Sequence, residues 1–160
     1  MRKAALVSDE TVKPTQISDA TLRSLFGYSM KRAFNVVQAD LLLALKPYDL
    51  RMLTYTALVL IADNPGLRQA QLADAMDIER PNLVVIIDEL ERRELIVRER
   101  VPSDRRAYAL KVTLAGQQLY EQAVAAVTAH EKALLQGIPN EDRDAVIATL
   151  KRIEKNQKRS

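Results

Sequence analysis

Residues Leu72 to Gly116 read LADAMDIERPNLVVIIDELERRELIVRERVPSDRRAYALKVTLAG, and this stretch decides the fold. Its first part places apolar residues at helical spacing, and Asp77-Ile78-Glu79 then leaves room only for a turn. Pro81 suits the first turn of a following helix, where its missing N–H removes no hydrogen bond. The order predicts a helix-turn-helix.

The second helix of this motif has two chemically different faces. One face is apolar and predicted to be core: Leu83, Ile86, Ile87 and Leu90. The other would enter a DNA groove, where the Asn82 amide can pair with adenine and Val84 or Val85 suits a thymine methyl group. Asn82 has a second interpretation, as a cap for the helix N-terminus. The candidate DNA-contacting residues of this helix are Arg80, Pro81, Asn82, Val84 and Val85.

An arginine-rich hairpin follows the second helix. Leu95–Val101 and Ala107–Thr113 alternate with period two, and Pro102–Arg106 lies between them as a charged tip. Such a tip can contact a phosphate or enter a narrow minor groove, although an ordinary solvated hairpin has the same pattern. The candidate DNA contacts of the hairpin are Arg98, Arg105 and Arg106.

Together these parts resemble the MarR family of bacterial transcription regulators, and the resemblance extends from about Leu22 onward. The matching segments are Leu72-Ala73, Arg80 to Leu90, Leu90-Glu91-Arg92-Arg93, Asp104-Arg105-Arg106 and Thr113-Leu114-Ala115-Gly116. The resemblance implies a winged helix-turn-helix, mainly α with a small antiparallel β wing and with N- and C-terminal dimerisation helices. It also implies that Asp104 and Arg106 brace the wing.

The chain departs from the family pattern at three places. Glu94 stands where relatives usually have Gly, although a left-handed turn there suits Glu less well. Val84 and Val85 replace a hydroxyl and a basic residue, and Glu79 replaces a small capping residue. The operator sequence of a relative is therefore not transferable.

Composition restricts the function. The 160 residues are 48% hydrophobic and contain no Cys and one His, His130, which excludes disulfides, thiol redox sensing and Cys-ligated metal sites and makes any metal site unexpected. No run reaches about 18 apolar residues and no signal sequence is evident, so we expect a soluble, cytoplasmic protein. We find no Ser-His-Asp set or Gly-rich phosphate loop, so we expect neither an enzyme nor a cofactor.

Charge is informative through its distribution. The formal net charge of +3 is small for a protein that binds nucleic acid through charge alone. Residues 151–160 concentrate basic side chains, which either touch flanking DNA or form a solvated helix end. A winged-helix module that binds proteins and has lost sequence-specific DNA binding is therefore kept as the alternative function.

Helical patterns flank the DNA-reading segment. A long helix from Leu22 is ended by Pro47, and a helix from about Leu50 to Ala62 follows. The second helix is predicted to bury Leu50, Leu53, Ala57, Leu58 and Ile61. A further helix begins after Thr113 and runs to about Leu135, and the last resumes behind Asn140.

The terminal helices carry apolar stripes that one small winged domain cannot cover, so they predict a homodimer. Two-fold symmetry would place the recognition helices one DNA turn, roughly 34 Å, apart on a pseudo-palindromic double-stranded operator. The predicted domains are a flexible segment (1–20), an N-terminal dimerisation helix (21–48), the winged domain (49–113) and C-terminal dimerisation helices (114–160).

The resemblance also implies release from DNA by a small, often aromatic and anionic, effector bound between the dimerisation helices and the winged domain. Tyr28 and Arg32 on the first helix and Thr54 and Tyr55 on the second would border this crevice. The tyrosines could stack on a phenolic ring and Arg32 could pair with a carboxylate. Equally open is a structural role, with the tyrosines in an interface or core and Arg32 in a salt bridge.

Overall fold

The structure is a computed structural model that describes residues 17–101 and 104–157, with the side chains of residues 104–107 and 157 left outside the description. Most of the segment predicted to be flexible, residues 1–20, therefore lies outside the described residues. The chain divides into two compact units, the first ending at Asn35 and the second beginning at Val36. Each unit is described by itself.

The first unit contains α1 (Ala20–Arg23) and the beginning of α2 (Phe26–Leu45). The prediction of one uninterrupted helix from Leu22 is wrong, because the helix breaks at Ser24 and Leu25. The Ser24 hydroxyl donates to the Thr21 carbonyl (2.7 Å), a local bond that competes with helix continuation. The predicted end is confirmed, since α2 stops at Leu45 and Pro47 lies in a 3₁₀ turn, η1 (Lys46–Tyr48).

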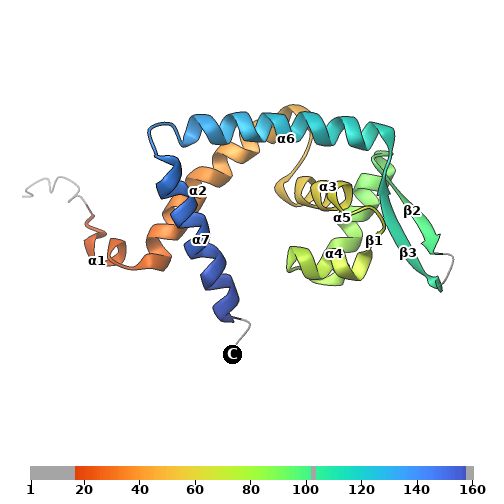
Figure 1. Cartoon of the computed structure of the whole chain (residues 1–160), viewed down its shortest axis with the longest axis horizontal. Helices are drawn as coiled ribbons and strands as arrows, with labels where there is room; N and C mark the ends of the chain where they lie inside the picture. Colours follow the sequence, from red (N-terminus) through yellow and green to blue (C-terminus); the bar gives the residue numbers. More distant parts are fainter. Residues whose placement is uncertain (1–16, 102–103, 158–160) are drawn as a thin grey trace, which may run out of the picture. The chain divides into compact units, whose positions relative to one another are not determined.

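The second unit holds the predicted helix-turn-helix and wing (Figure 1). Its elements, after η1, are α3 (Met52–Asp63), β1 (Leu67–Arg68), α4 (Gln69–Met76), α5 (Arg80–Arg92), β2 (Ile96–Val101) and β3 (Asp104–Val112). The strands form an antiparallel sheet in the order β1-β3-β2. Strand β1 was not predicted, because two residues are too few to show a period-two pattern.

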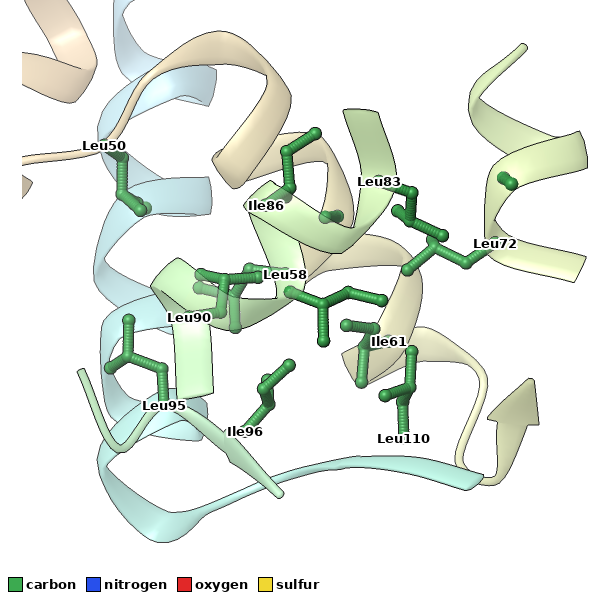
Figure 2. Packing of buried hydrophobic residues seen from close by; sticks show 14 of the residues in the cluster. Leu50, Leu58, Ile61, Leu72, Leu83, Ile86, Leu90, Leu95, Ile96 and Leu110 are labelled. Atoms are coloured by element: carbon green, nitrogen blue, oxygen red, sulfur yellow. The ribbon is translucent and has the colours of Figure 1, made fainter. Parts of the chain in front are cut away.

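The core lies where α3, α4, α5 and the sheet meet (Figure 2). Leu58, Leu72 and Ile87 have no exposed surface, and Ile96 and Leu110 close the core from the sheet. Burying each such side chain contributes ~1.5–3 kcal/mol, before the cost of ordering the chain. The predicted apolar face of the second motif helix, Leu83 to Leu90, is confirmed as part of this core.

The predicted buried face at α3 is confirmed for Leu50, Ala57, Leu58 and Ile61, and wrong at one position. Leu53 was expected in the core but is 44% exposed, whereas Thr54 is completely buried. The Thr54 hydroxyl accepts from the Arg51 amide and donates to the Arg51 carbonyl, both at 2.9 Å. Because both hydrogen-bonding capacities are satisfied at the start of the helix, burial of this hydroxyl carries little penalty.

The Thr-x-x-Gly element joins the wing to α6 (Leu114–Leu134). The Thr113 hydroxyl donates to the Glu94 carbonyl (2.7 Å) and accepts from the Gly116 amide (3.0 Å). A Cβ at Gly116 would lie 1.9 Å from the Leu95 carbonyl oxygen. Only glycine therefore permits this contact between α6 and the chain entering the wing.

Helix α7 (Asn140–Gln157) and the part of α2 after Asn35 expose apolar side chains. The exposed fractions are 59% for Val146, 41% for Ile153 and 57% for Val36. Within residues 17–101 and 104–157, no helix has both the length and the apolar character needed to cross a membrane.

Candidate nucleic-acid interface

Helix α5 follows the predicted turn and exposes the predicted face. Its N-cap residue is Glu79, and Asn82 donates its backbone N–H to the Glu79 carbonyl (3.0 Å), which leaves the exposed Asn82 side chain outside that bond. Val84 and Val85 are 44% and 63% exposed on the side opposite the core. The predicted exposure of these valines is confirmed, and the helix presents them together with the exposed Arg80 and Pro81.

A cavity of about 420 Å³ lies beside the N-terminus of α5. Arg68 at the end of β1, Arg80 at the start of α5 and Tyr108 on β3 line it together with the apolar side chains of Leu83 and Val84. Arg80 and Val84 were predicted as DNA contacts, whereas Arg68 and Tyr108 were not identified from the sequence. Arg68 directly precedes the first motif helix, a position that pattern analysis could have included.

Arg98 lies against the recognition helix. Its guanidinium pairs with the Asp88 carboxylate and, at 3.0 Å, with the Glu91 carboxylate. The side chain is 26% exposed, and its Nε is buried with no hydrogen-bond partner in the part of the chain that the structure describes. The Arg98 guanidinium, which was predicted to contact DNA, thus already pairs with two carboxylates of α5.

Strand alternation explains the direction of Arg98. It lies two residues after the buried Ile96 on β2 and opposite the buried Leu110 on β3, so it shares their helix-facing side of the sheet. This period-two relation to Ile96 was visible in the sequence. The carboxylates that it meets come from another element and were not identified.

The tip of the wing differs from its prediction. Strand β3 begins at Asp104, which pairs with Val101, whereas a loop was predicted through Arg106. The register shifts after Arg100↔Tyr108, leaving three extra residues, 105–107, on β3 before the Val101↔Asp104 pair. The predicted loop is thus wrong for Asp104 to Arg106, and an irregular strand takes its place.

Side chains at the tip are outside the described part of the structure. This applies to the predicted DNA contacts Arg105 and Arg106 and to the predicted brace between Asp104 and Arg106. Pro102 and Ser103 lie outside the described residues altogether.

The C-terminal end of α5 is attached to the segment before α3. Arg93 donates to the carbonyl oxygens of Asp49 (2.6 Å) and Tyr48 (3.0 Å), and Arg51 pairs with Glu89. These contacts were not predicted, because they join residues about forty positions apart. They hold the end of α5 that lies away from its exposed valines.

The predicted effector residues fall in two units. In the first, Tyr28 donates its hydroxyl to the Asp19 carboxylate (3.0 Å), and Arg32 is exposed on α2. In the second, the Thr54 hydroxyl is used at the start of α3, and Tyr55 is partly buried.

Tyr55 belongs to a group of acidic and phenolic side chains on α3 and α6, two helices in contact. Burial raises the pKa of Tyr55, and the nearby carboxylates of Asp63 and Glu131 raise it further. Tyr120 donates to the Asp63 carboxylate (2.8 Å), and this bond raises the pKa of Tyr120. Tyr120 and Asp63, which lie 57 residues apart, were not identified from the sequence.

The single histidine pairs with one carboxylate. His130 Nδ1 lies 3.4 Å from Asp40 Oδ1. Across the described ranges, no group of three or more His, Asp or Glu side chains could hold a metal ion.

A helix-turn-helix with an antiparallel wing, extended on both sides by helices with exposed apolar faces, defines a class of winged-helix transcription regulators. The family model described as MarR family matches residues 48–107, which include α3 to the beginning of β3. The chain belongs to the MarR family of transcription regulators.

Three comparisons support this membership. A protein of Thauera aromatica, provisionally described as a transcriptional regulatory protein for the hcr operon, is 38% identical over 99 residues. That match covers 62% of this chain and spans only 60% of the relative's length.

Two solved structures of the repressor CouR match more of the chain. One, bound to a 23-mer DNA duplex, has 35% identity and a TM-score of 0.83, covering 88% of this chain and 99% of CouR. The other, from Rhodococcus jostii RHA1 and bound to p-coumaroyl-CoA, has 34% identity and a TM-score of 0.77, with 85% and 95% covered.

Proposed function

We propose that the protein is a homodimeric, sequence-specific DNA-binding regulator that represses transcription from a pseudo-palindromic operator. The observation that carries this proposal is the exposed face of α5, where Val84 and Val85 stay 44% and 63% exposed although valine adds no helix propensity. In a major groove the same two side chains would meet thymine methyl groups. A helix with one face in the core and such a face outward suits groove insertion.

In this proposal each part of the motif has its own task. Asn82, Val84 and Val85 read base edges, while Arg80 and Pro81 lie where the helix enters the groove. Arg105 and Arg106 of the wing contact phosphates or the minor groove, with Asp104 bracing Arg106. Arg98 supports α5 through Asp88 and Glu91 in place of the DNA contact predicted for it.

The dimer proposal rests on the exposed apolar faces of α2 and α7. Two-fold symmetry of a homodimer matches two operator half-sites. The match with the repressor CouR in its complex with a DNA duplex covers 99% of the CouR chain, and it supports both DNA as the partner and the repressor role. A regulator of this kind acts in the cytoplasm, on the bacterial chromosome, and needs no catalytic activity.

We further propose that a small aromatic, anionic compound releases the protein from DNA. CouR bound to p-coumaroyl-CoA supports an aromatic effector. Tyr28, Arg32 and Tyr55 stay candidates for its recognition, whereas the Thr54 hydroxyl would first have to leave its bonds to Arg51. The effector would act by its different affinity for the DNA-bound and free states.

Selection of the purified protein on a random double-stranded DNA library tests the regulator proposal. We expect an enriched pseudo-palindrome with half-sites about 10 bp apart. Affinity for it should fall with salt, with a log-log slope near −0.9 for each phosphate contacted. If a folded, dimeric protein enriches no sequence, the protein-interaction alternative replaces this proposal.

A further inference from the structure

The cavity beside α5 is lined by residues that are far apart in the sequence. Strand pairing and the N-termini of two helices bring them close together. Strand β1 pairs with β3 so that Arg68 lies opposite Ala109, next to Tyr108. Helix α4 begins at the residue after Arg68, and α5 begins at Arg80. The N-termini of both helices therefore border the same cavity, which Arg68, Arg80 and Tyr108 line.

The chemistry of this cavity favours an oxyanion. Two guanidinium groups and a phenol supply hydrogen-bond donors, and helix N-termini add positive partial charge. Among the residues whose side chains the structure describes, none that lines it is acidic. A second hollow, of about 540 Å³, also has Arg80 in its wall, but Asp74, Asp77 and Glu79 line it as well and would repel the same anion. Of the two hollows, the one lined by Arg68, Arg80 and Tyr108 is therefore the one whose charge suits an anion.

The position of the cavity indicates which anion it takes. Val84 forms part of its wall and is also one of the exposed residues of the recognition helix. An anion held between Arg68 and Arg80 would therefore lie immediately beside the bases that α5 contacts. Every nucleotide of a duplex carries such an anion at a fixed distance from its base.

We propose that the Arg68–Arg80–Tyr108 cavity binds one phosphodiester of the operator backbone in each half-site and thereby fixes the register of α5 in the major groove. This inference rests on the proposed DNA-binding function and adds a phosphate subsite that includes Arg68 and Tyr108. Phosphate contacts position a protein on a duplex, whereas base contacts specify sequence. The Tyr108 hydroxyl and the two guanidinium groups are the donors.

A chemical double-mutant cycle tests the subsite. The operator recovered by selection is synthesised with one uncharged methylphosphonate per half-site, moved along the backbone one position at a time. For the unaltered protein we expect one position at which neutralisation raises Kd roughly tenfold or more for each subunit, as for hydrogen bonds to a charged group. For Arg80→Gln the same neutralisation should raise Kd clearly less than it does for the unaltered protein, because one of the two guanidinium groups is already absent.

Two further variants complete the cycle. Tyr108→Phe keeps the ring and the fold while removing one donor, so it should reduce the effect of the same methylphosphonate. Arg92→Gln alters an exposed arginine at the other end of α5 and should retain the full effect. The salt slope of Arg80→Gln should be smaller by about 0.9 for each phosphate that this variant no longer binds.

The outcomes separate this inference from the proposed function. If selection enriches no sequence, the DNA-binding function fails. If an operator is recovered but every methylphosphonate acts equally on the unaltered protein and on Arg80→Gln, only the phosphate subsite is overturned. The subsite for DNA is also overturned if inorganic phosphate shifts the NMR signals of Tyr108 while operator DNA does not, since the cavity would then bind a free phosphate compound.

Discussion

At the scale of single residues, Glu94 occupies a backbone conformation that glycine prefers. Its φ is 56°, in the left-handed region, and its amide donates to the Glu91 carbonyl at the end of α5 (2.8 Å). Its own carbonyl accepts from Thr113, so the conformation is held from two sides. The departure from the family pattern seen in the sequence thus corresponds to real strain at the entrance of the wing.

Replacing this residue should stabilise the protein. We expect Glu94→Gly to raise the free energy of unfolding by ~0.5–1 kcal/mol, because relief of the left-handed strain exceeds the added entropy of glycine. Urea denaturation measures the change. Glu94→Ala is the matched control, since it removes the charge and keeps the Cβ. Equal stabilisation by both variants would show that charge, and not backbone strain, is responsible.

The proposed base contact of Asn82 depends on a single side-chain amide. We expect Asn82→Ala to lose ~1–3 kcal/mol of discrimination at one base pair of each half-site, with little change on random DNA. Competition binding with single-base operator variants measures this loss. Equal weakening on operator and random DNA would instead assign Asn82 a structural or backbone-contacting role.

At the scale of elements, β2 and α5 are joined by ion pairs between Arg98 and two carboxylates. Asp88 and Glu91 place negative charge on α5, the helix proposed to approach DNA, and Arg98 of the wing pairs with both carboxylates. Because these groups are partly exposed, the ion pairs contribute only about 0–1 kcal/mol to stability. Their larger effect should be on DNA binding, where an unpaired carboxylate meets the phosphate backbone.

Paired substitutions distinguish this role of Arg98 from a direct DNA contact. We expect Arg98→Gln to weaken operator binding several-fold and Asp88→Asn to restore most of that affinity in the double variant, since the unpaired carboxylate is removed. Fluorescence anisotropy with labelled operator measures each Kd. Arg100→Gln on the same strand is the control, and Asp88→Asn should not rescue it. Failure to rescue Arg98→Gln would favour the direct contact.

Elements were predictable where one short segment contains the whole signal. The apolar spacing of α5 and the turn before it are local, and the structure confirms both. The exchange of Leu53 for Thr54 in the core was not predictable from hydrophobicity, because it depends on a hydroxyl paired with the backbone. The cavity near Arg68 depends on the pairing of β1 with β3, which no local pattern reports.

At the scale of the whole molecule, stability should respond to alkaline pH through the tyrosines between α3 and α6. The pKa values of Tyr55 and Tyr120 are raised in the folded chain, so folding favours their neutral forms. Their contribution is fully present below the ordinary tyrosine pKa of about 10 and is lost as pH rises through the folded values. Neutral pH therefore lies on the stable side of this transition.

We expect the free energy of unfolding to fall above about pH 10. Replacing both residues, in Tyr55→Phe with Tyr120→Phe, should make this fall shallower because the two phenols no longer ionise. Urea denaturation across the pH range measures the slope, and ultraviolet difference spectroscopy follows phenol ionisation. Tyr108→Phe is the control, since that side chain lies in the cavity beside α5. An identical slope in the double variant would place the alkaline transition elsewhere.

Apolar side chains exposed on α7 and α2 are the surface proposed to form the dimer interface. Val146 is 59% exposed on α7, and a carboxylate there would be costly to bury against a second copy. We expect Val146→Asp to shift the protein toward monomers in light scattering and to weaken binding to the full operator far more than to a single half-site. Ala148→Asp, about 200° around the same helix from Val146, is the control and should stay dimeric. A dimeric Val146→Asp protein with full operator affinity would exclude this face of α7 from the interface, leaving the exposed face of α2 to explain how two recognition helices come one DNA turn apart.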